Sequence, residues 1–336
     1  MAAAEVLVHG AGAIGLYVGG MLARGGVAVH FVARPRIAEV LRRQGLAVTD
    51  LDGRRTALGP ERFSVGEGLG DAPRPELALL TVKSAATAAA AAELAAALPA
   101  GTPVLSLQNG VDNPDRIRAA APPLVTVAGM VAFNVVQEAP GSVRQTTGGR
   151  LAAARTPTSL LWAPRFAAAG VPLDLHDDMR AVAWGKLLLN LNNPVNALAG
   201  VPLREELLDR GYRRVLADLM EEGLAVLVAA GVRPARLTPV PPAWLPSLLR
   251  LPTPIFRRLA SRMLTIQPEA RSSMYDDRLA GRATEIGDLC GAVVRLAEQQ
   301  GQSAPRNRRM VELIESAPAG RWYGAAELRA LLDARA

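Results

Sequence analysis

Apolar and polar residues near the start of the chain alternate in the order strand, helix, strand. Residues 6–9 and 27–32 are short, mostly apolar runs of the length of a buried strand, and residues 14–24 between them have helical character. The first run passes into the helix through the segment Gly10-Ala11-Gly12-Ala13-Ile14-Gly15. In this βαβ context a GxGxxG motif predicts a dinucleotide site, because its glycines let the backbone approach a pyrophosphate at the helix N-terminus. A plain glycine-rich turn is the weaker alternative.

The same alternation continues and then stops. Apolar runs at 77–82 and 104–107 predict two further strands, separated by an Ala-rich helix over 85–98. Segments rich in Pro and Gly predict loops near residues 59–75, 99–103 and 139–149. Long helical periodicity then replaces the strands. The pattern predicts an α/β fold, with a cofactor-binding Rossmann domain and a mostly parallel sheet at 1–175, followed by an all-α domain for substrate and dimer contacts at 176–336.

The end of the second predicted strand indicates which dinucleotide binds. An NAD site usually places Asp or Glu there to accept hydrogen bonds from the ribose, whereas this chain has Val32-Ala33-Arg34-Pro35-Arg36. An Arg in reach and no carboxylate favour the 2′-phosphate of NADP(H). Arg34 is the expected first contact. Arg36 is either a second contact or a solvated surface charge, and the sequence does not favour one over the other.

Composition excludes some classes of function. The chain has 336 residues, which is too many for one hydrophobic core and suits two domains. Its net charge of +7 is spread along the sequence, and only 4% of its residues are aromatic, so we expect no nucleic-acid partner. No run of about 18 uncharged apolar residues appears, so we expect no membrane-spanning helix.

Cysteine and histidine usage argues against a metal site. Cys290 is the only cysteine and the three histidines are scattered, so neither residue type offers a ligand cluster. A lone cysteine cannot form an internal disulfide, and no basic region precedes an apolar segment at the start of the sequence. We therefore expect a cytoplasmic protein.

Lysine usage is more selective than the net charge suggests. The 38 basic residues are 36 arginines and two lysines, Lys83 and Lys186. A retained Lys suggests a compact ammonium that can give up a proton, which Arg cannot do, although both lysines could simply have escaped a compositional bias. Lys83 and Asn109 each follow a predicted strand, and ligands of open α/β sheets bind beyond such carboxyl ends.

Several motifs resemble the ketopantoate reductase family. They are the glycine motif, Thr81-Val82-Lys83 and Gln108-Asn109-Gly110-Val111. Members of this family reduce 2-dehydropantoate (ketopantoate) to pantoate with NADPH. The resemblance implies that Lys83 and Asn109 lie at the nicotinamide end of the cofactor and that Asn109 also meets the substrate. Asn134 matches a further cofactor contact, with a turn-forming Asn as an equal alternative.

A helix with a polar face is predicted at the start of the second domain. Asp177 or Asp178 can cap this helix. Lys186, Asn190 and Asn193 are spaced i, i+4 and i+7, so they share one of its faces. Polar side chains on a Leu-rich, buried helix need partners, and a substrate can be one of them. The alternative is a core helix whose polar edge lies in water.

The resemblance gives roles to this polar face. It implies that Lys186 is the general acid and that Asn190 and Asn193 contact the substrate. Asn192 could take the place of Asn193, because the family has this Asn one residue further along. Leu203 stands where the family has another substrate-contacting Asn.

The last matching motifs are Pro268-Glu269-Ala270-Arg271-Ser272-Ser273-Met274 and Thr284-Glu285-Ile286-Gly287. They imply that Ser273 binds the substrate carboxylate and that Glu285 acts at the reacting oxygen and the cofactor. The resemblance runs from Val6 to about Ile314. Segment 241–264 is less typical, and its prolines favour a connection between helices over a helix that lies on a membrane surface.

The function expected from this reading is NADPH-dependent reduction of a 2-oxo acid, first of all ketopantoate to pantoate in pantothenate biosynthesis. One alternative is a reductase of another branched 2-oxo acid, and a second is an NADPH-binding sensor without catalysis. A basic protein that binds membrane or nucleic acid is a third. The expected partner is a small-molecule 2-oxo acid, and the resemblance allows a homodimer.

Overall fold

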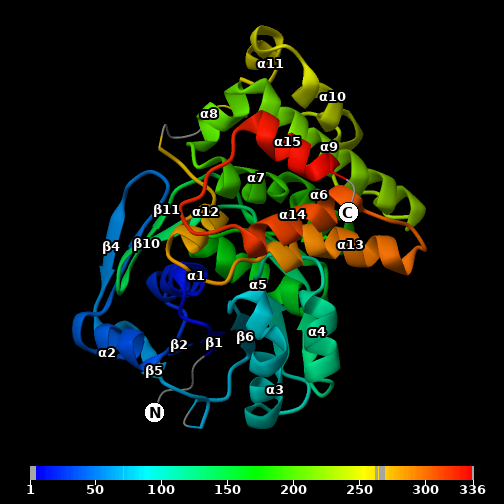
Figure 1. Cartoon of the computed structure of the whole chain (residues 1–336). Helices are drawn as coiled ribbons and strands as arrows, with labels where there is room; N and C mark the ends of the chain where they lie inside the picture. Colours follow the sequence, from blue (N-terminus) through cyan, green and yellow to red (C-terminus); the bar gives the residue numbers. More distant parts are fainter. Residues whose placement is uncertain (1–4, 71, 262–263, 265–268, 335–336) are drawn as a thin grey trace. The chain divides into compact units, whose positions relative to one another are not determined.

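The computed structural model describes residues 5–70, 72–261, 264 and 269–334. The chain forms two compact units, Met1–Met179 and Arg180–Ala336 (Figure 1). All the described strands belong to the first unit, and the second is helical, which confirms the predicted fold class. The sequence placed the boundary at residue 175, whereas the structure places it after Met179, the first residue of a helix.

The elements of the first unit alternate as expected for an α/β domain. Its strands are β1 Val6–His9, β2 Val29–Val32, β3 Leu46–Thr49, β4 Arg55–Leu58, β5 Ser64–Gly66, β6 Leu77–Leu80, β7 Pro103–Ser106, β8 Val125–Val127, β9 Gly129–Val131, β10 Val135–Ala139, β11 Ser142–Gln145, β12 Leu151–Ala154 and β13 Leu173–His176. Its helices are α1 Ala13–Arg24, α2 Pro35–Gln44, α3 Thr87–Ala97, α4 Asn113–Ala120 and α5 Pro157–Ala168, with short 3₁₀ helices η1 Pro60–Arg62 and η2 Ser84–Ala86.

The second unit is built from helices of very different length. They are α6 Met179–Asn190, α7 Asn192–Ala199, α8 Leu203–Leu208, α9 Arg210–Ala229, α10 Leu245–Arg250, α11 Thr253–Leu259, α12 Ser273–Leu279, α13 Cys290–Gln299, α14 Pro305–Ser316 and α15 Ala325–Asp333, with 3₁₀ helices η3 Pro242–Trp244 and η4 Ile286–Asp288. No helix of the described residues is long and apolar enough to cross a membrane.

The main sheet of the first unit has the strand order β5-β2-β1-β6-β7-β8, and all its paired strands are parallel. Strand order reverses between β1 and β6, which pair from Val6 with Leu77 to His9 with Leu80. In open α/β sheets a ligand binds beyond the carboxyl ends of the strands at this reversal. The loops that follow β1 and β6 are therefore the expected place for a cofactor.

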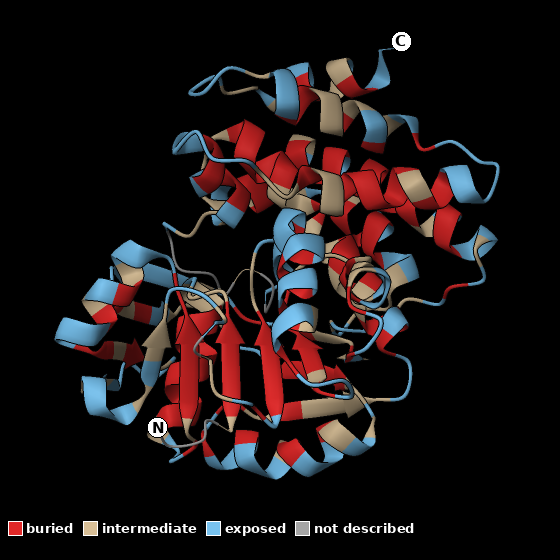
Figure 2. Ribbon diagram, turned by 90° about the horizontal axis from the view of Figure 1, so that it is seen from below, coloured by how far each residue is buried: buried red, intermediate tan, exposed pale blue. Residues whose placement is uncertain are grey.

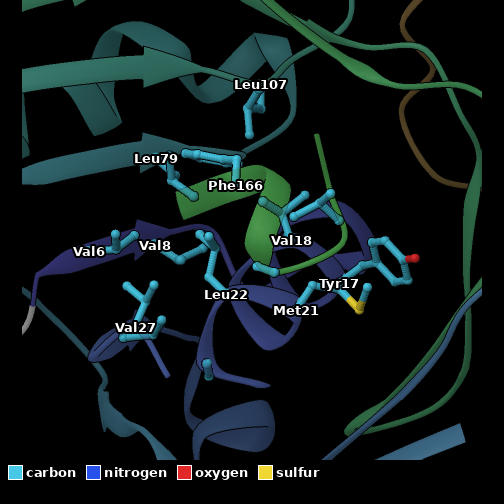
Figure 3. Close-up of a cluster of buried hydrophobic side chains, with 14 of the residues drawn as sticks. Val6, Val8, Tyr17, Val18, Met21, Leu22, Val27, Leu79, Leu107 and Phe166 are labelled. Atoms are coloured by element: carbon cyan, nitrogen blue, oxygen red, sulfur yellow. The ribbon is translucent and has the colours of Figure 1, made fainter. Parts of the chain in front are cut away.

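Alternation along the strands packs the sheet on both faces. Val8 contacts the cluster that contains Leu22 of α1 and Phe166 of α5 (Figure 3), whereas Leu7 belongs to a second cluster with Leu94 of α3. All five side chains are fully buried, and burial of each contributes about 1.5–3 kcal/mol to folding. In Figure 2 the central strands of the main sheet are red, and the outer faces of the covering helices are blue.

The loops predicted at 59–75 and 139–149 are wrong in part. The first contains η1 and β5, and the second contains β11. Strand β5 is an edge of the main sheet, whereas β10 and β11 join a second sheet of order β10-β11-β3-β4, and β13-β12-β9 form a third. Polar and small residues dominate strands such as Ser64–Gly66, so the apolar signal that marks a buried strand is weak there.

The prediction that one helix carries Lys186, Asn190 and Asn193 is also wrong. Helix α6 ends at Asn190, and α7 begins at Asn192. Pro194 explains the break, because it has no N–H to donate to the carbonyl of Asn190 and its ring clashes with that carbonyl. Asn193 therefore lies on a second helix, and the i, i+7 spacing from Lys186 does not show that the two side chains share a face.

Segment 241–264 was predicted as a connection between helices, and its described residues form η3, α10 and α11. Arg213 of α9 is 1% exposed and fixes this segment. Its guanidinium donates to the backbone oxygens of Leu249 at 2.9 Å and Leu251 at 2.8 Å, and it lies over the ring of Phe256. A buried cation that is satisfied by carbonyls stabilises the packing of α9 on α10.

Candidate cofactor site and catalytic residues

The three glycines of the motif have different structural roles. Gly10 adopts a φ of +112°, and a Cβ there would lie 2.7 Å from the backbone nitrogen of Val82. A Cβ on Gly15 would collide with the Gly10 carbonyl oxygen and lie 2.5 Å from Thr81 Oγ1. A Cβ on Gly12 would meet no described atom within 4 Å. Gly10 and Gly15 thus allow close packing of α1 on the strands, whereas Gly12 leaves space beside the helix N-terminus.

This space lies at the positive end of a helix. Helix α1 begins at Ala13, its N-cap Gly12 has no side chain to accept from the first N–H groups, and its first turn has no acidic residue. An anion at such a position is stabilised by about 0.3–1 kcal/mol through the helix dipole, in addition to its hydrogen bonds. The arrangement fits a pyrophosphate. Ala11 and Ile14 complete the predicted motif in the same loop and first turn.

Arg34 and Arg36 lie where the sequence predicted a 2′-phosphate contact. Arg34 is the N-cap of α2, directly after β2, and both side chains are exposed. Neither guanidinium has a hydrogen bond or ion pair with the residues that the structure describes. Arg42 on the same helix is instead paired with Glu67 at 2.7 Å. Two unpaired guanidinium groups at this strand end fit a dianionic phosphate.

A buried polar network joins the loops that follow β6 and β7. The carbonyl oxygen of Asn109 accepts from Ser84 Oγ at 2.7 Å and from Asn113 Nδ2 at 2.5 Å. Thr87 Oγ1 donates to Asn113 Oδ1 at 2.8 Å, and Gln108 Nε2 donates to Thr87 Oγ1 at 2.7 Å. Every member except Asn109 is buried. Buried, mutually satisfied amides and hydroxyls hold these loops in one conformation.

This network places two residues that the sequence singled out. Lys83 is exposed beside Ser84, and Asn109 is half-buried. Strand β6 ends at Leu80, earlier than the predicted residue 82, so Lys83 lies in the loop after the strand. The structure brings the two loops together through Ser84, as expected for neighbouring strand ends.

Asn134 lies just before β10 and is exposed. Its backbone N–H donates to Thr147 Oγ1 at 2.8 Å, and its carbonyl accepts from the Thr146 N–H at 2.9 Å. These backbone bonds join the start of β10 to the end of β11 and do not form a local turn at Asn134. A cofactor contact by its side chain stays a prediction.

Lys186 and Glu285 interact within the second unit. Burial lowers the pKa of Lys186 from 10.5 to about 8, and the carboxylate of Glu285 partly opposes this shift. Lys186 lies on α6 among Leu-rich neighbours, and Glu285 directly precedes η4. An ammonium with a pKa near 8 is mostly protonated at neutral pH and can still give up its proton. This is the property required of a general acid.

The structure also links Asn193 with Ser273. Ser272 is the N-cap of α12, and its Oγ donates to the backbone oxygen of Asn193 at 3.1 Å. Ser273 is the exposed first residue of α12, while Asn190 and Asn193 are half-buried. The N-termini of α7 and α12 therefore lie together, and Pro268 of the predicted motif lies outside the described residues.

Sequence reasoning missed two buried residues beside this pair. Asn196 Nδ2 donates to Glu206 Oε2 at 2.7 Å, and Asn196 Oδ1 accepts from the Ser272 N–H at 2.9 Å. Asn192 also hydrogen-bonds Glu206 through its side chain. The i, i+4 spacing of Asn192 and Asn196 was a signal for a shared face, but nothing in the sequence paired that face with Glu206.

Metal-ligating residues do not cluster in the part of the chain that the structure describes, where no group of three or more His, Cys, Asp or Glu could hold an ion. Cys290 is buried on α13, and burial raises the pKa of its thiol. His9 and His30 are buried on β1 and β2, and burial lowers the pKa of both. These three side chains are thus neutral residues of the core at neutral pH.

Both units match models of one protein family. The model described as Ketopantoate reductase PanE/ApbA matches residues 6–157, and the one described as Ketopantoate reductase PanE/ApbA C terminal matches residues 178–317. The chain belongs to the ketopantoate reductase family. The resemblance seen in the sequence is therefore confirmed, and so is the expectation of an NADP-dependent oxidoreductase.

Two curated relatives of this ketopantoate reductase family member are similar along nearly their whole length. The 2-dehydropantoate 2-reductase of Halobacterium salinarum is 29% identical over 320 residues, which is 93% of this chain and 98% of the relative. That of Mesorhizobium japonicum is 26% identical over 337 residues, with 92% and 96% covered.

Solved structures agree with the family assignment. A ketopantoate reductase of the PanE/ApbA family from Ralstonia eutropha is 32% identical with a TM-score of 0.80, and the match covers 92% of this chain and 97% of that one. D-mandelate dehydrogenase, solved with NADH and anilino(oxo)acetate, has a TM-score of 0.77 at 18% identity, with 97% and 99% covered. At that identity the second likeness shows the fold alone.

Proposed function

We propose that this chain reduces 2-dehydropantoate to pantoate with NADPH, as a step of pantothenate biosynthesis. The observation that carries the proposal is the interaction of Lys186, half-buried and with a lowered pKa, with Glu285 in a member of this family. Its cytoplasmic location and a homodimer remain predictions.

The residues of the first unit are suited to NADPH. The glycine loop of Gly10, Gly12 and Gly15 would receive the pyrophosphate at the N-terminus of α1. Gly12 leaves the open space for it, and Gly10 and Gly15 allow the loop to pack closely. Arg34 would bind the 2′-phosphate, with Arg36 as a second contact. Lys83 and Asn109 would lie at the nicotinamide end. When bound, NADPH supplies the hydride that C2 of the 2-oxo acid accepts.

Lys186 would donate the proton that the reduced carbonyl oxygen needs. Negative charge develops on that oxygen as C2 is reduced, and a nearby ammonium both offsets the charge and delivers the proton. Glu285 would hold the Lys186 ammonium in place. Asn109 would orient the carbonyl.

The remaining polar residues would bind the rest of the substrate. Ser273 would bind the carboxylate, and Asn190 and Asn193 would bond the distal end. The side chain of Asn192 already bonds Glu206, which favours Asn193 for the substrate contact. Reduction of another branched 2-oxo acid is the second candidate, because apolar Leu203 lies beside the segment that leads to Ser273. The Leu203 N–H donates to the Ala270 oxygen at 2.9 Å.

The test is a panel of 2-oxo acids, with ketopantoate and ketoisovalerate first, followed by NADPH absorbance. We expect turnover of ketopantoate, and its loss in Lys186→Ala. Reduction of a different 2-oxo acid alone would replace the substrate, whereas NADPH binding without turnover of any of them would favour the sensor.

A further inference from the structure

Glu206 is a buried carboxyl that the proposed chemistry does not use. It is 1% exposed on α8, although its neighbours Arg204 and Glu205 are exposed. The hydrogen-bonding partners of its carboxyl are the side-chain amides of Asn196 and Asn192 on α7. A buried carboxyl without a cation is costly to a fold, so its place beside two asparagines calls for an explanation.

The bonds of Asn196 lead from Glu206 to the candidate substrate residues. Asn196 is fully buried and uses both ends of its amide, with Nδ2 on Glu206 Oε2 and Oδ1 on the Ser272 N–H. Ser272 in turn donates to the backbone oxygen of Asn193 and accepts from the Tyr275 N–H at 3.1 Å, which caps α12. The Glu206 network, defined as Glu206, Asn196 and Ser272, thus joins α8, α7 and the start of α12.

The geometry of the network fixes the orientation of this amide. Oδ1 accepts from the Ser272 N–H, and the two hydrogens of Nδ2 go to Glu206 Oε2 and to the Val201 backbone oxygen at 2.9 Å. Without the Glu206 acceptor one of these hydrogens would be buried and unpaired, while the bond to Val201 remains. Loss of the Glu206 acceptor would leave the Nδ2 group of Asn196 held by Val201 alone and weaken the bond of its Oδ1 to the Ser272 N–H. The start of α12, with Ser273, and the backbone of Asn193 would then be held less firmly.

We infer that Glu206 is a positioning residue for substrate binding, which acts through Asn196 and Ser272 on Asn193 and Ser273. This inference rests on the proposed function, since it assumes that these two residues bind the 2-oxo acid. Glu206 itself touches neither substrate nor cofactor.

The charge state of Glu206 gives the network a distinctive pH dependence. Burial raises the pKa of Glu206 from 4.5 to about 8, and the hydrogen bonds from Asn196 and Asn192 partly oppose this shift. Among the residues that the structure describes, the titratable group that interacts with Glu206 is Tyr212 on α9, whose pKa is raised above 10 and which stays neutral over this range. Glu206 is thus mostly protonated at pH 7. Above about pH 8 it would become a buried carboxylate without a cation, which the segment can relieve only by opening to water.

The experiment compares Glu206→Leu and Glu206→Gln with Glu205→Leu, a control on the exposed neighbouring carboxyl. At pH 7 we expect Glu206→Leu to raise the KM for the 2-oxo acid about tenfold, the effect of one lost buried hydrogen bond, with kcat and the NADPH Kd nearly unchanged. Glu206→Gln keeps an uncharged acceptor and should restore the lower KM. A KM for Glu206→Leu equal to that of Glu205→Leu would overturn the inference.

Glu206→Gln also decides the matter if Glu206→Leu does not fold. The KM of the wild type should rise above about pH 8, and this rise should be absent in Glu206→Gln, while the fall of kcat that comes from Lys186 persists in both. The same KM profile in both proteins would contradict a positioning role for Glu206.

A wild type that reduces no 2-oxo acid would refute the proposed function, and amide hydrogen exchange then tests the network separately. Exchange at residues 272–276 should be faster in Glu206→Leu than in the Glu205→Leu control at pH 7, and above about pH 8, where the control has an ionised Glu206, it should be slower in Glu206→Gln than in that control. Equal exchange would show that the network does not fix the start of α12.

Discussion

The two units hold their candidate residues with buried polar side chains of different kinds. In the first unit, the network that joins the loops after β6 and β7 consists of Ser84, Thr87, Gln108 and Asn113, none of which changes charge with pH. In the second unit the half-buried Lys186 and the buried Glu206 have pKa values shifted to about 8 by loss of solvation. A neutral network fixes geometry at any pH, whereas a buried ionisable group also makes its unit sensitive to pH. Cofactor binding should therefore depend on shape and fixed charge, and catalysis on titration.

The test with the largest expected effect replaces each of the two lysines by Ala and compares the two variants. Lys186→Ala should lower kcat by a factor on the order of 10² to 10⁴ and leave the NADPH Kd nearly unchanged, because it removes a proton donor. Lys83→Ala should weaken NADPH binding as well, since Lys83 belongs to the strand-end loops of the first unit. Steady-state kinetics and cofactor titration of both variants give the answer, and near-normal turnover in Lys186→Ala would remove it from the mechanism.

Arg34→Ala should erode the preference for NADPH over NADH. Each charge-assisted hydrogen bond to the 2′-phosphate contributes about 1.5–3 kcal/mol, so the ratio of the two Kd values should fall by at least about tenfold. Arg42→Ala is a matched control, because this Arg is already paired with Glu67 on the same helix. An unchanged ratio in Arg34→Ala would show that another residue selects the cofactor.

Substitutions at two glycines of the motif should affect protein stability and NADPH binding separately. Gly12→Ala should leave the thermal midpoint nearly unchanged, because its φ of −84° suits Ala and a Cβ meets no described atom within 4 Å. The methyl group would fill the pyrophosphate space and weaken NADPH binding about tenfold. Gly15→Ala should instead lower the thermal midpoint, since its Cβ would collide with the Gly10 carbonyl oxygen. Thermal melts and NADPH titrations of both variants are needed, and tight binding by Gly12→Ala would move the pyrophosphate elsewhere.

These residues also show which features of the fold and the site could be predicted from the sequence alone. The glycine motif was predictable because a dinucleotide site is made largely by consecutive residues, and the structure finds it between β1 and α1. The Glu206 network joins residues that are 10 and 76 positions apart, through side chains that no local pattern connects. The break after Asn190 was readable from Pro194, but apolar periodicity continues through it and favoured one helix. Strand β5 was missed because its pairing with β2, rather than its own residues, stabilises it.

The pH dependence of turnover follows from the sign of the Lys186 shift. Burial disfavours the ammonium, so the pKa of Lys186 falls from 10.5 to about 8, and the proton donor is lost as the pH rises through that value. We expect kcat for reduction to be level below pH 7 and to fall about tenfold per unit above pH 8. The NADPH Kd should stay flat between pH 7 and 9, as the neutral strand-end network requires. An NADPH Kd that changes with pH in the same way as kcat would contradict the proposed difference between the two units.

The smallest expected effect concerns substrate selection by Leu203. Ketopantoate has a 4-hydroxyl that ketoisovalerate lacks, and a site that bonds this hydroxyl rejects the analogue because its own polar group would be left unpaired. Leu203 cannot offer such a bond, and its N–H on the Ala270 oxygen places it beside the segment that leads to Ser273. Leu203→Asn should therefore raise kcat/KM for ketopantoate relative to ketoisovalerate several-fold, as one neutral hydrogen bond of about 1 kcal/mol allows. Arg204→Asn, on the exposed side of the same helix, should leave the ratio unchanged. If both variants keep the wild-type ratio, Leu203 does not face the substrate, and Asn190 and Asn193 alone would determine the distal pocket.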